Sequence, residues 1–172
     1  DINMQSRIGS DPYFVAKPQM NRLCKYAGKG LDILLSKQIE ATNFDDNKWT
    51  LKTSQGELFD DFDYLFLAIP SHQAIKLIPE SFKYFDIVSN IKMTGCFTLM
   101  LGFKEDLKIG FDAALVKESI INWISINSSK PQRKDGFSVV ANTGNQWADN
   151  NIEEDVEVVK QKMITALKEI LN

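Results

Sequence analysis

An apolar run with no polar face, Tyr-Leu-Phe-Leu-Ala-Ile at positions 64–69, ends abruptly at Pro70. A strand needs this composition when it is covered on both sides, as in the parallel sheet of an α/β domain. Before it, apolar and polar residues alternate over positions 39–53 on either side of a turn-forming Asp-Asp-Asn, which predicts a hairpin whose strands each bury one face. Residues 31–79 are therefore predicted to form strands buried on one face, followed by a strand buried on both faces. A short helix is expected at 71–77.

Composition excludes several classes of protein. The 172 residues are 44% hydrophobic, which is ample for a core, and the net charge of −3 gives no electrostatic reason to expect nucleic acid or an anionic membrane as partner. No apolar run approaches the roughly 20 residues that span a bilayer. Cys24 and Cys96 match no metal spacing and are predicted to be reduced, buried thiols of a cytoplasmic protein. Because the first residue is Asp1 and not Met, we expect a piece of something longer.

The N-terminal part is predicted to enter as irregular chain over residues 1–18, with an apolar patch at 13–15. A helix is expected to begin at Pro18, whose missing N–H is no loss at that position. Its core-facing stripe consists of Met20, Leu23, Cys24 and Ala27, and the glycines at 28 and 30 end it.

Strand patterns dominate the second half of the chain. Residues 93–103, 111–116, 120–127 and 136–142 are predicted strands with short polar connections, which favours an antiparallel sheet. Residues 79–88 are expected to form a short helix or irregular connector before it.

The last element is an amphipathic helix expected to cover one face of that sheet. Its stripe recurs every three or four residues: Ile152, Val156, Val159, Met163, Leu167 and Ile170. Asn151 is the predicted N-cap. The predicted fold class is α+β, a mainly antiparallel sheet covered by a long C-terminal helix, plus a β-hairpin and one buried strand.

Few residues of the sequence are candidates for catalysis or metal binding. His72 is the one histidine in the sequence, so no histidine pair can bind a metal, and it is expected at a helix start. The carboxylate clusters lie in predicted turns and helix starts, where they are typical turn formers. Gly28-Lys29-Gly30 follows a helix, so it cannot be a dinucleotide turn. We therefore predict no catalytic side chain and no metal ligand.

Two stretches carry a resemblance to a known family. Pro18-Gln19-Met20 with Leu23, then the hairpin, then residues 63–70 resemble the "P-G-M-x-x-L" helix, hairpin and "D-x-V-V-L-A-x-P" strand of flavin-dependent amine oxidoreductases. Residues 122–133, Asn-Trp-Ile-Ser-Ile-Asn-Ser-Ser-Lys-Pro-Gln-Arg, resemble the "W-I-x-x-N-S-S-K-P-x-R" run of the renalase-like, NAD/FAD-dependent branch. The resemblance covers residues 4–171.

Departures from the family pattern define what the chain is expected to supply. Gln19 replaces a usual Gly, and Ser71-His72 replaces Ala-Pro. The G-x-G-x-x-G loop and the Gly-Asp segment that meet the flavin phosphates and ribose are missing from this sequence. The resemblance implies that residues 1–79 belong to a FAD-binding part, including the buried strand as its remnant, and residues 80–172 to a substrate-binding part.

The resemblance also implies site residues. Ile39, Ala68 and Pro70 would lie along FAD, because ligands bind where strands end in an open α/β sheet. Core packing explains Ile39 and Ala68 equally well. Trp123, Asn127 and Lys130 would contact the substrate or the flavin ring, although sheet packing remains the alternative for Trp123.

The implied function is oxidation of a small amine or a reduced nicotinamide (NAD(P)H-type) substrate by FAD, with the cofactor supplying the redox chemistry. The alternative is a binding or structural module without flavin activity. The expected partners are a small-molecule substrate and, through an exposed edge of the truncated flavin part, a second copy of the chain. Nucleic acid and membrane are not expected.

Overall fold

The computed structural model describes residues 14–133 and 136–171. The chain divides into two compact units, and each is described by itself. Gly30–Met93 form what we call the hairpin unit, and Asp1–Lys29 with Thr94–Asn172 form the sheet unit. None of the helices in the described residues is long and apolar enough to cross a membrane.

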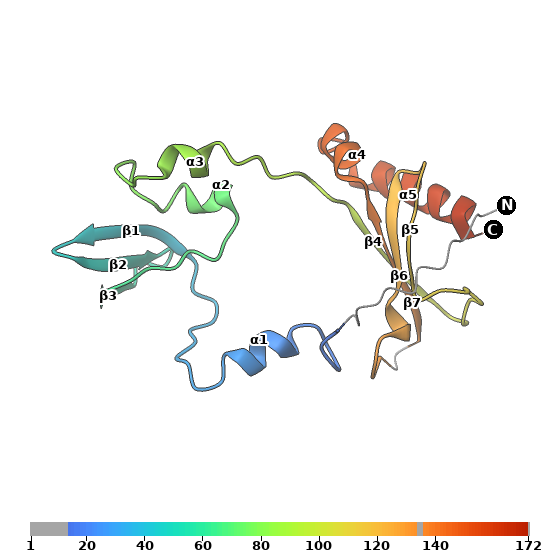
Figure 1. Ribbon diagram of the computed structural model, residues 1–172, viewed down its shortest axis with the longest axis horizontal. Coiled ribbons are helices and arrows are strands. Elements are labelled where there is room, and N and C mark those ends of the chain that lie inside the picture. The colour runs from blue at the N-terminus through green and yellow to red at the C-terminus, as the bar shows by residue number, and fades with distance from the viewer. Residues whose placement is uncertain (1–13, 134–135, 172) are drawn as a thin grey trace. The chain divides into compact units, whose positions relative to one another are not determined.

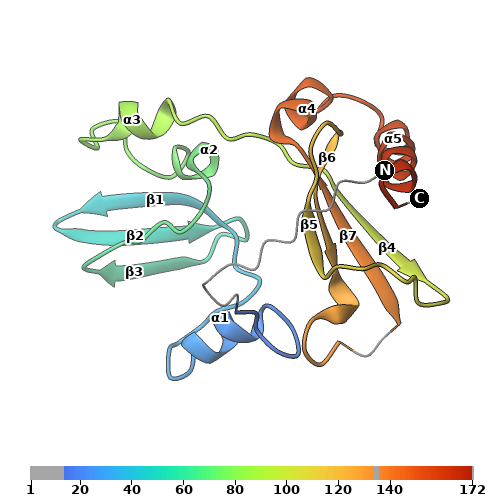
Figure 2. The ribbon, with the colours of Figure 1, turned by 45° about the vertical axis from the view of Figure 1, so that its right-hand side comes forward.

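The hairpin unit is built on a three-stranded antiparallel sheet in the order β1-β2-β3 (Figure 2). Its strands are β1 (Ile39–Asp45), β2 (Lys48–Thr53) and β3 (Leu58–Phe62). Asp46 and Asn47 take φ of 50° and 58°, the left-handed conformation that a two-residue hairpin turn requires and that Asp and Asn tolerate. The predicted hairpin is confirmed, whereas β3 was not expected.

A buried threonine fixes the turn between β2 and β3. The Thr53 hydroxyl accepts a hydrogen bond from the backbone N–H of Glu57 at 3.1 Å, and the Thr53 N–H donates to the Glu57 carbonyl at 2.9 Å. The Glu57 carboxylate lies 2.5 Å from the Lys37 ammonium, which holds the chain entering β1 against the same turn.

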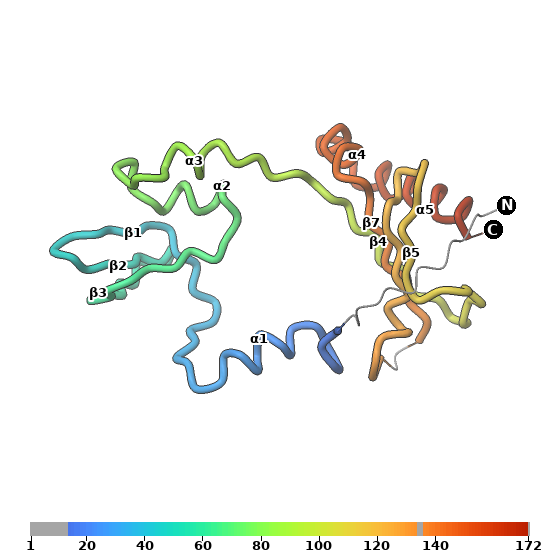
Figure 3. The backbone as a smooth tube through the Cα atoms, viewed as in Figure 1, coloured from blue at the N-terminus to red at the C-terminus, as the bar shows by residue number. Residues whose placement is uncertain are grey.

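The prediction for residues 64–69 is wrong: the segment is neither a strand nor buried on both faces. Between β3 and α2 the chain is extended (Figure 3) but pairs with no strand in the described residues. Leu65 and Leu67 are half-buried, whereas Tyr64 and Phe66 are 80% and 89% exposed. A two-sided strand needs neighbours along both edges and a layer on each face. The hairpin unit offers cover for one face alone.

Two short helices complete the hairpin unit. Pro70 ends the extended run, and its carbonyl accepts the first helical hydrogen bonds of α2 (Ser71–Ala74). This agrees with the predicted short helix. The Thr42 hydroxyl donates to the Leu77 carbonyl and so joins β1 to the turn after α2. A second helix, α3 (Phe85–Ser89), lies in the predicted connector.

The sheet unit contains the predicted antiparallel sheet (Figure 1). Its strand order is β4-β7-β6-β5 (Figure 2). The strands are β4 (Thr98–Phe103), β5 (Ala113–Leu115), β6 (Ile121–Ile126) and β7 (Phe137–Thr143). A bulge between Ile121 and Trp123 shifts the register of β6 against β7. Without that bulge, Trp123 would point to the opposite face of the sheet.

The core lies between this sheet and the long helix α5 (Val156–Leu171). Val159, Met163 and Leu167, four residues apart, form the buried stripe of the helix. The strands contribute Leu99, Ile121, Ile124, Ile126, Val139 and Ala141 to the same cluster. The prediction that the C-terminal helix covers one face of the sheet is confirmed.

The strand residues on the other side of this sheet define what we call the open face. Cross-strand partners share a face, so the pairing gives its rows. One row is Leu115, Trp123, Asn142 and Thr98, and the next is Ala113, Ser125, Val140 and Met100, followed by Ser138 and Gly102. Met100 and Leu115 are 76% and 72% exposed.

The N-cap of α5 is Asp155 and not the predicted Asn151. The Asp155 carboxylate accepts hydrogen bonds from the N–H groups of Glu157 and Val158 at 2.8 and 3.3 Å, which is the pattern of an N-cap. Asn151 instead donates to the Trp147 carbonyl at 2.8 Å, at the end of α4 (Asn145–Asn150). Ile152 lies outside the helix and is exposed.

The N-terminal helix also differs from the prediction. It spans α1 (Arg22–Ala27), begins four residues after Pro18 and buries none of its residues. A helix this short is unstable alone, so its limits depend on what packs against it.

Both cysteines are exposed, which contradicts the predicted buried thiols. The predicted irregular segment lies mostly outside the described residues.

Candidate functional site

The centre of the open face is an aromatic side chain between polar and apolar neighbours. Trp123 on β6 pairs with Leu115 on β5 and with Asn142 on β7. The Asn142 amide donates to the Thr98 hydroxyl at 2.8 Å, which fixes the polar end of this row. The Trp123 side chain is in the sheet yet 37% exposed, so its ring is available to a ligand.

The second part of the site is a chain of polar side chains where β6 runs into the 3-10 turn η1 (Asn127–Ser129). The Lys130 ammonium donates to the Asn127 amide oxygen at 3.2 Å. The Asn127 amide nitrogen donates in turn to the Ser138 hydroxyl at 3.5 Å. The structure therefore joins Asn127 and Lys130 by a hydrogen bond and adds Ser138 from β7.

Hydrogen bonds to the backbone hold this turn in one conformation. The Ser129 hydroxyl donates to the Ile126 carbonyl at 2.9 Å, and the Ser128 hydroxyl accepts from the N–H of Ser138 at 3.2 Å. The Lys130 N–H donates to the Asn127 carbonyl at 3.3 Å. The turn is thus pinned to both β6 and β7.

Trp123 and the polar chain belong to one surface. Alternate residues of a strand point to the same face, so Trp123 and Ser125 follow one another along the open face. Asn127, the first residue of η1, is joined to this face by its hydrogen bond to Ser138. Four residues of strand span about 13 Å. The aromatic ring and the Lys130 ammonium therefore mark the two ends of an elongated site.

Charge is concentrated at one end of this site. The strand residues of the open face carry no ionisable group.

The groups with a shifted pKa lie in the hairpin unit instead. Asp63 and then Asp61 raise the pKa of Lys48 by hydrogen bonding, and Lys37 lowers that of Glu57. Both are exposed ion pairs around the hairpin.

The predicted cofactor residues lie in the hairpin unit and so apart in sequence from the open face. Ile39 is half-buried at the start of β1, while Ala68 and Pro70 are exposed on either side of Ile69. Simple core packing therefore does not describe Ala68. His72 is exposed in α2, and no cluster in the described residues could hold a metal ion.

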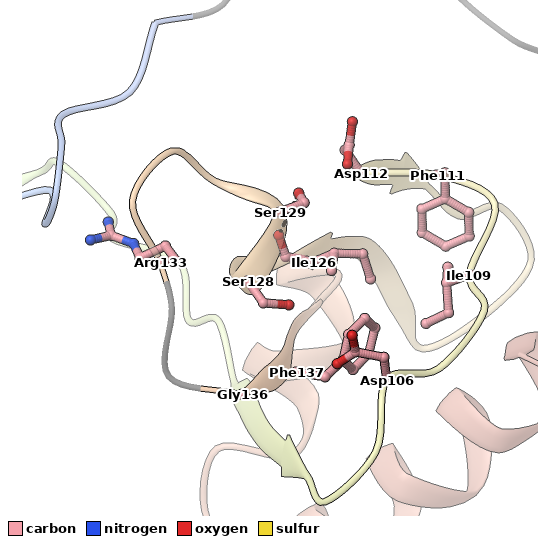
Figure 4. Close-up of a pocket in the computed structure, with 10 residues that line it drawn as sticks. All are labelled: Asp106, Ile109, Phe111, Asp112, Ile126, Ser128, Ser129, Arg133, Gly136 and Phe137. Carbon is pink, nitrogen blue, oxygen red and sulfur yellow. Dashed lines mark hydrogen bonds between the residues drawn. The ribbon is translucent and has the colours of Figure 1, made fainter.

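A surface hollow of about 380 Å³ lies at the end of the sheet near η1 (Figure 4). Its floor includes Ile126 and Phe137, which pack against the core and so lie on the helix side of the sheet. Asp106 also lines the hollow, whereas the guanidinium of Arg133 points away from the other lining residues (Figure 4). None of the predicted substrate residues lines it.

Sequence reasoning missed Ser138 and Asn142. Both sit at ordinary strand positions, and their roles depend on which residue lies opposite on β6. The bulge that sets this register has no glycine or proline to signal it.

These elements define an α+β chain in which the sheet face opposite the long helix carries an aromatic side chain and polar side chains. The chain belongs to the flavin-containing amine oxidoreductase family, which matches residues 13–172. FAD is the cofactor that this family implies.

Solved structures show the same fold. A proposed protoporphyrinogen oxidase from Exiguobacterium sp. 255-15 is 21% identical, with a TM-score of 0.64 over 89% of this chain and 35% of its own. A triple mutant of putrescine oxidase with redesigned cofactor binding is 12% identical, with a TM-score of 0.65 over 87% of this chain and 34% of its own. The chain thus spans about a third of the length of these structures.

Proposed function

We propose that this chain forms part of a FAD-dependent oxidoreductase and that the open face forms one wall of its substrate site. The match to the flavin-containing amine oxidoreductase family over residues 13–172 is the observation that carries the proposal. The similarity of residues 122–133 to the run "W-I-x-x-N-S-S-K-P-x-R" supports a narrower placement in the renalase-like branch.

The described residues fit the ring end of a flavin or a flat substrate. Trp123 offers an exposed aromatic surface, and Asn142, opposite it on β7, carries an amide group that can both donate and accept. FAD, when bound, supplies the electron-accepting chemistry. The residues of this chain would bind and orient the substrate and keep water from its reacting part.

The hairpin unit is proposed to serve the cofactor side. Ile39, Ala68 and Pro70 would offer backbone and small side chains to the dinucleotide. The exposure of Ala68 and Pro70 supports this role, since a ligand can reach them. No G-x-G-x-x-G loop occurs in this sequence, so the phosphate contacts must come from residues outside it.

The electron donor is proposed to be a small amine or a reduced nicotinamide (NAD(P)H-type) substrate. Hydride transfer to a flavin needs positioning more than a general base. The scarcity of ionisable groups on the open face agrees with such a reaction. The same scarcity also supports the second candidate, a module that binds a ligand and has no flavin activity.

Flavin content separates the two candidates. A protein that contains this chain together with a phosphate-binding loop should purify yellow, with about one FAD per chain by visible absorption. A colourless protein that takes up no FAD would remove the oxidoreductase proposal. The 172-residue chain alone should show no flavin absorbance, and stoichiometric loading of it would contradict the claim that the phosphate contacts lie elsewhere.

A further inference from the structure

Lys130 is the charged group at the end of an otherwise uncharged open face. We infer that this face selects a ligand with an anionic group, a carboxylate or a phosphate, which Lys130 binds while a flat apolar part of the ligand lies against Trp123. The inference rests on the proposed function and narrows its substrate class.

The ammonium of Lys130 has unused hydrogen-bonding capacity. Among the described residues it donates one hydrogen bond, to the Asn127 amide oxygen, and an ammonium has three N–H groups to offer. Its side chain is half-buried, and none of the ion pairs found in the described residues includes it. An oxyanion of a ligand would give this half-buried ammonium a charge-assisted hydrogen bond, which is stronger than a bond between neutral groups.

Asn127 determines where that ammonium is held. Its amide nitrogen is committed to the Ser138 hydroxyl, so its oxygen is turned toward Lys130. The turn itself is pinned to both neighbouring strands by Ser128 and Ser129. A charge held in place before binding loses less conformational entropy when the ligand arrives.

The distance along the strand sets the shape of the ligand. Trp123 on β6 and Asn127, the first residue of η1, are about 13 Å apart at the spacing of an extended chain. One ligand that reaches both must therefore be elongated, with its flat end and its anionic end well separated. A simple monoamine would meet no carboxylate among the strand residues of the open face. Reduced nicotinamide dinucleotides and carboxylate-bearing amines therefore fit this face better.

Four probes that differ only in the terminal group test this selection on the 172-residue chain: phenylvalerate, phenylpentyl phosphate, phenylpentanol and phenylpentylamine. Binding is followed by NMR, through the indole N–H of Trp123 and the side-chain amide of Asn127. The anionic probes should bind at least about tenfold more tightly than the alcohol and the amine, because hydrogen bonds to a charged partner are the stronger ones. Comparing carboxylate with phosphate tells which oxyanion the face prefers.

Substitutions at Lys130 assign the preference to this side chain. Lys130→Gln should abolish the tenfold difference, and Lys130→Arg should retain it. Lys168→Gln, at an exposed position of α5 on the helix side of the sheet, is the matched control and should change nothing. The amide spectrum of each variant reports whether the fold is intact.

Three results would overturn the inference: equal binding of amine and carboxylate, no shift with any probe, or an unchanged preference in folded Lys130→Gln. The readout needs no flavin, so it is independent of the FAD measurement. Anion selection in a protein that takes up no FAD would remove the redox role alone. FAD uptake without anion selection would remove the present inference alone.

Discussion

Trp123 on β6 lies directly opposite Asn142 on β7, and both side chains lie on the open face of the sheet. A bulge two residues before this pair creates the register, so the aromatic ring points away from the core that α5 covers. The position that resembles the family's "W-I" run is thus a surface position and not part of the core.

The core beneath α5 should depend strongly on Met163. Its side chain is buried in the cluster formed with the strands of the sheet. Met163→Ala should destabilise the sheet unit by about 2–5 kcal/mol, because the lost contacts leave a cavity. Val156→Ala, on the exposed side of the same helix, should change stability by less than about 0.5 kcal/mol. Urea unfolding followed by circular dichroism measures both, and equal losses would contradict the packing described.

Capping of α5 should depend on Asp155 and not on Asn151. Asp155→Ala removes the acceptor of two backbone N–H groups and should cost about 1 kcal/mol. Asn151→Ala should leave the first turn of α5 intact, since its amide serves α4. Hydrogen exchange of the Glu157 and Val158 amides separates the two variants. Faster exchange in Asn151→Ala alone would restore the cap predicted from the sequence.

The hairpin unit should lose stability in acid through Glu57. The Lys37 ammonium lowers the pKa of this carboxyl below its ordinary value of 4.5. Its contribution is therefore present above pH 4.5 and is lost as the pH falls through the lowered value. Glu57→Gln should flatten this acid dependence in thermal unfolding between pH 7 and pH 3. Glu153→Gln, which removes an exposed carboxyl outside the described ion pairs, should not flatten it.

Self-association is expected from the exposed side of the extended segment at 64–69. Tyr64 and Phe66 lie on it, and its backbone pairs with no strand in the described residues, a combination that promotes pairing with another chain. The double substitution Tyr64→Ser and Phe66→Ser should shift the 172-residue chain toward monomer in sedimentation velocity. A matched change at Leu65 and Leu67 should instead destabilise the hairpin unit. A wild-type chain that is monomeric at all concentrations would contradict this prediction.

The sequence predicted most elements whose patterns depend on near neighbours. The hairpin turn at Asp46-Asn47 and all four strands of the larger sheet follow from periodicity and turn chemistry. The predicted stripe of the last helix is confirmed at Val159, Met163 and Leu167, whereas Ile152 and Val156 are exposed. The errors arose where tertiary context decides. The run at 64–69 has the composition of a two-sided strand, but its state depends on neighbours that the pattern cannot specify.

The candidate site, too, was predicted only in part from the sequence. Trp123, Asn127 and Lys130 were predicted from a motif, and the structure joins the last two by a hydrogen bond. Ser138 and Asn142 were missed because their contribution depends on strand pairing across eleven or more residues. The exposure of Ala68 could not be predicted either, since it follows from the single covered face of its segment.

The central claim is that the open face positions the electron donor of a flavin oxidoreductase. Anaerobic bleaching of bound FAD by NADH, NADPH or benzylamine tests it in a flavin-loaded protein that contains this chain. Trp123→Ala should raise the donor concentration for half-maximal bleaching by roughly tenfold at unchanged FAD content, because a stacked aromatic contributes about 1 kcal/mol or more. Val158→Ala, exposed on α5, serves as the control. Unchanged bleaching in Trp123→Ala would contradict the account.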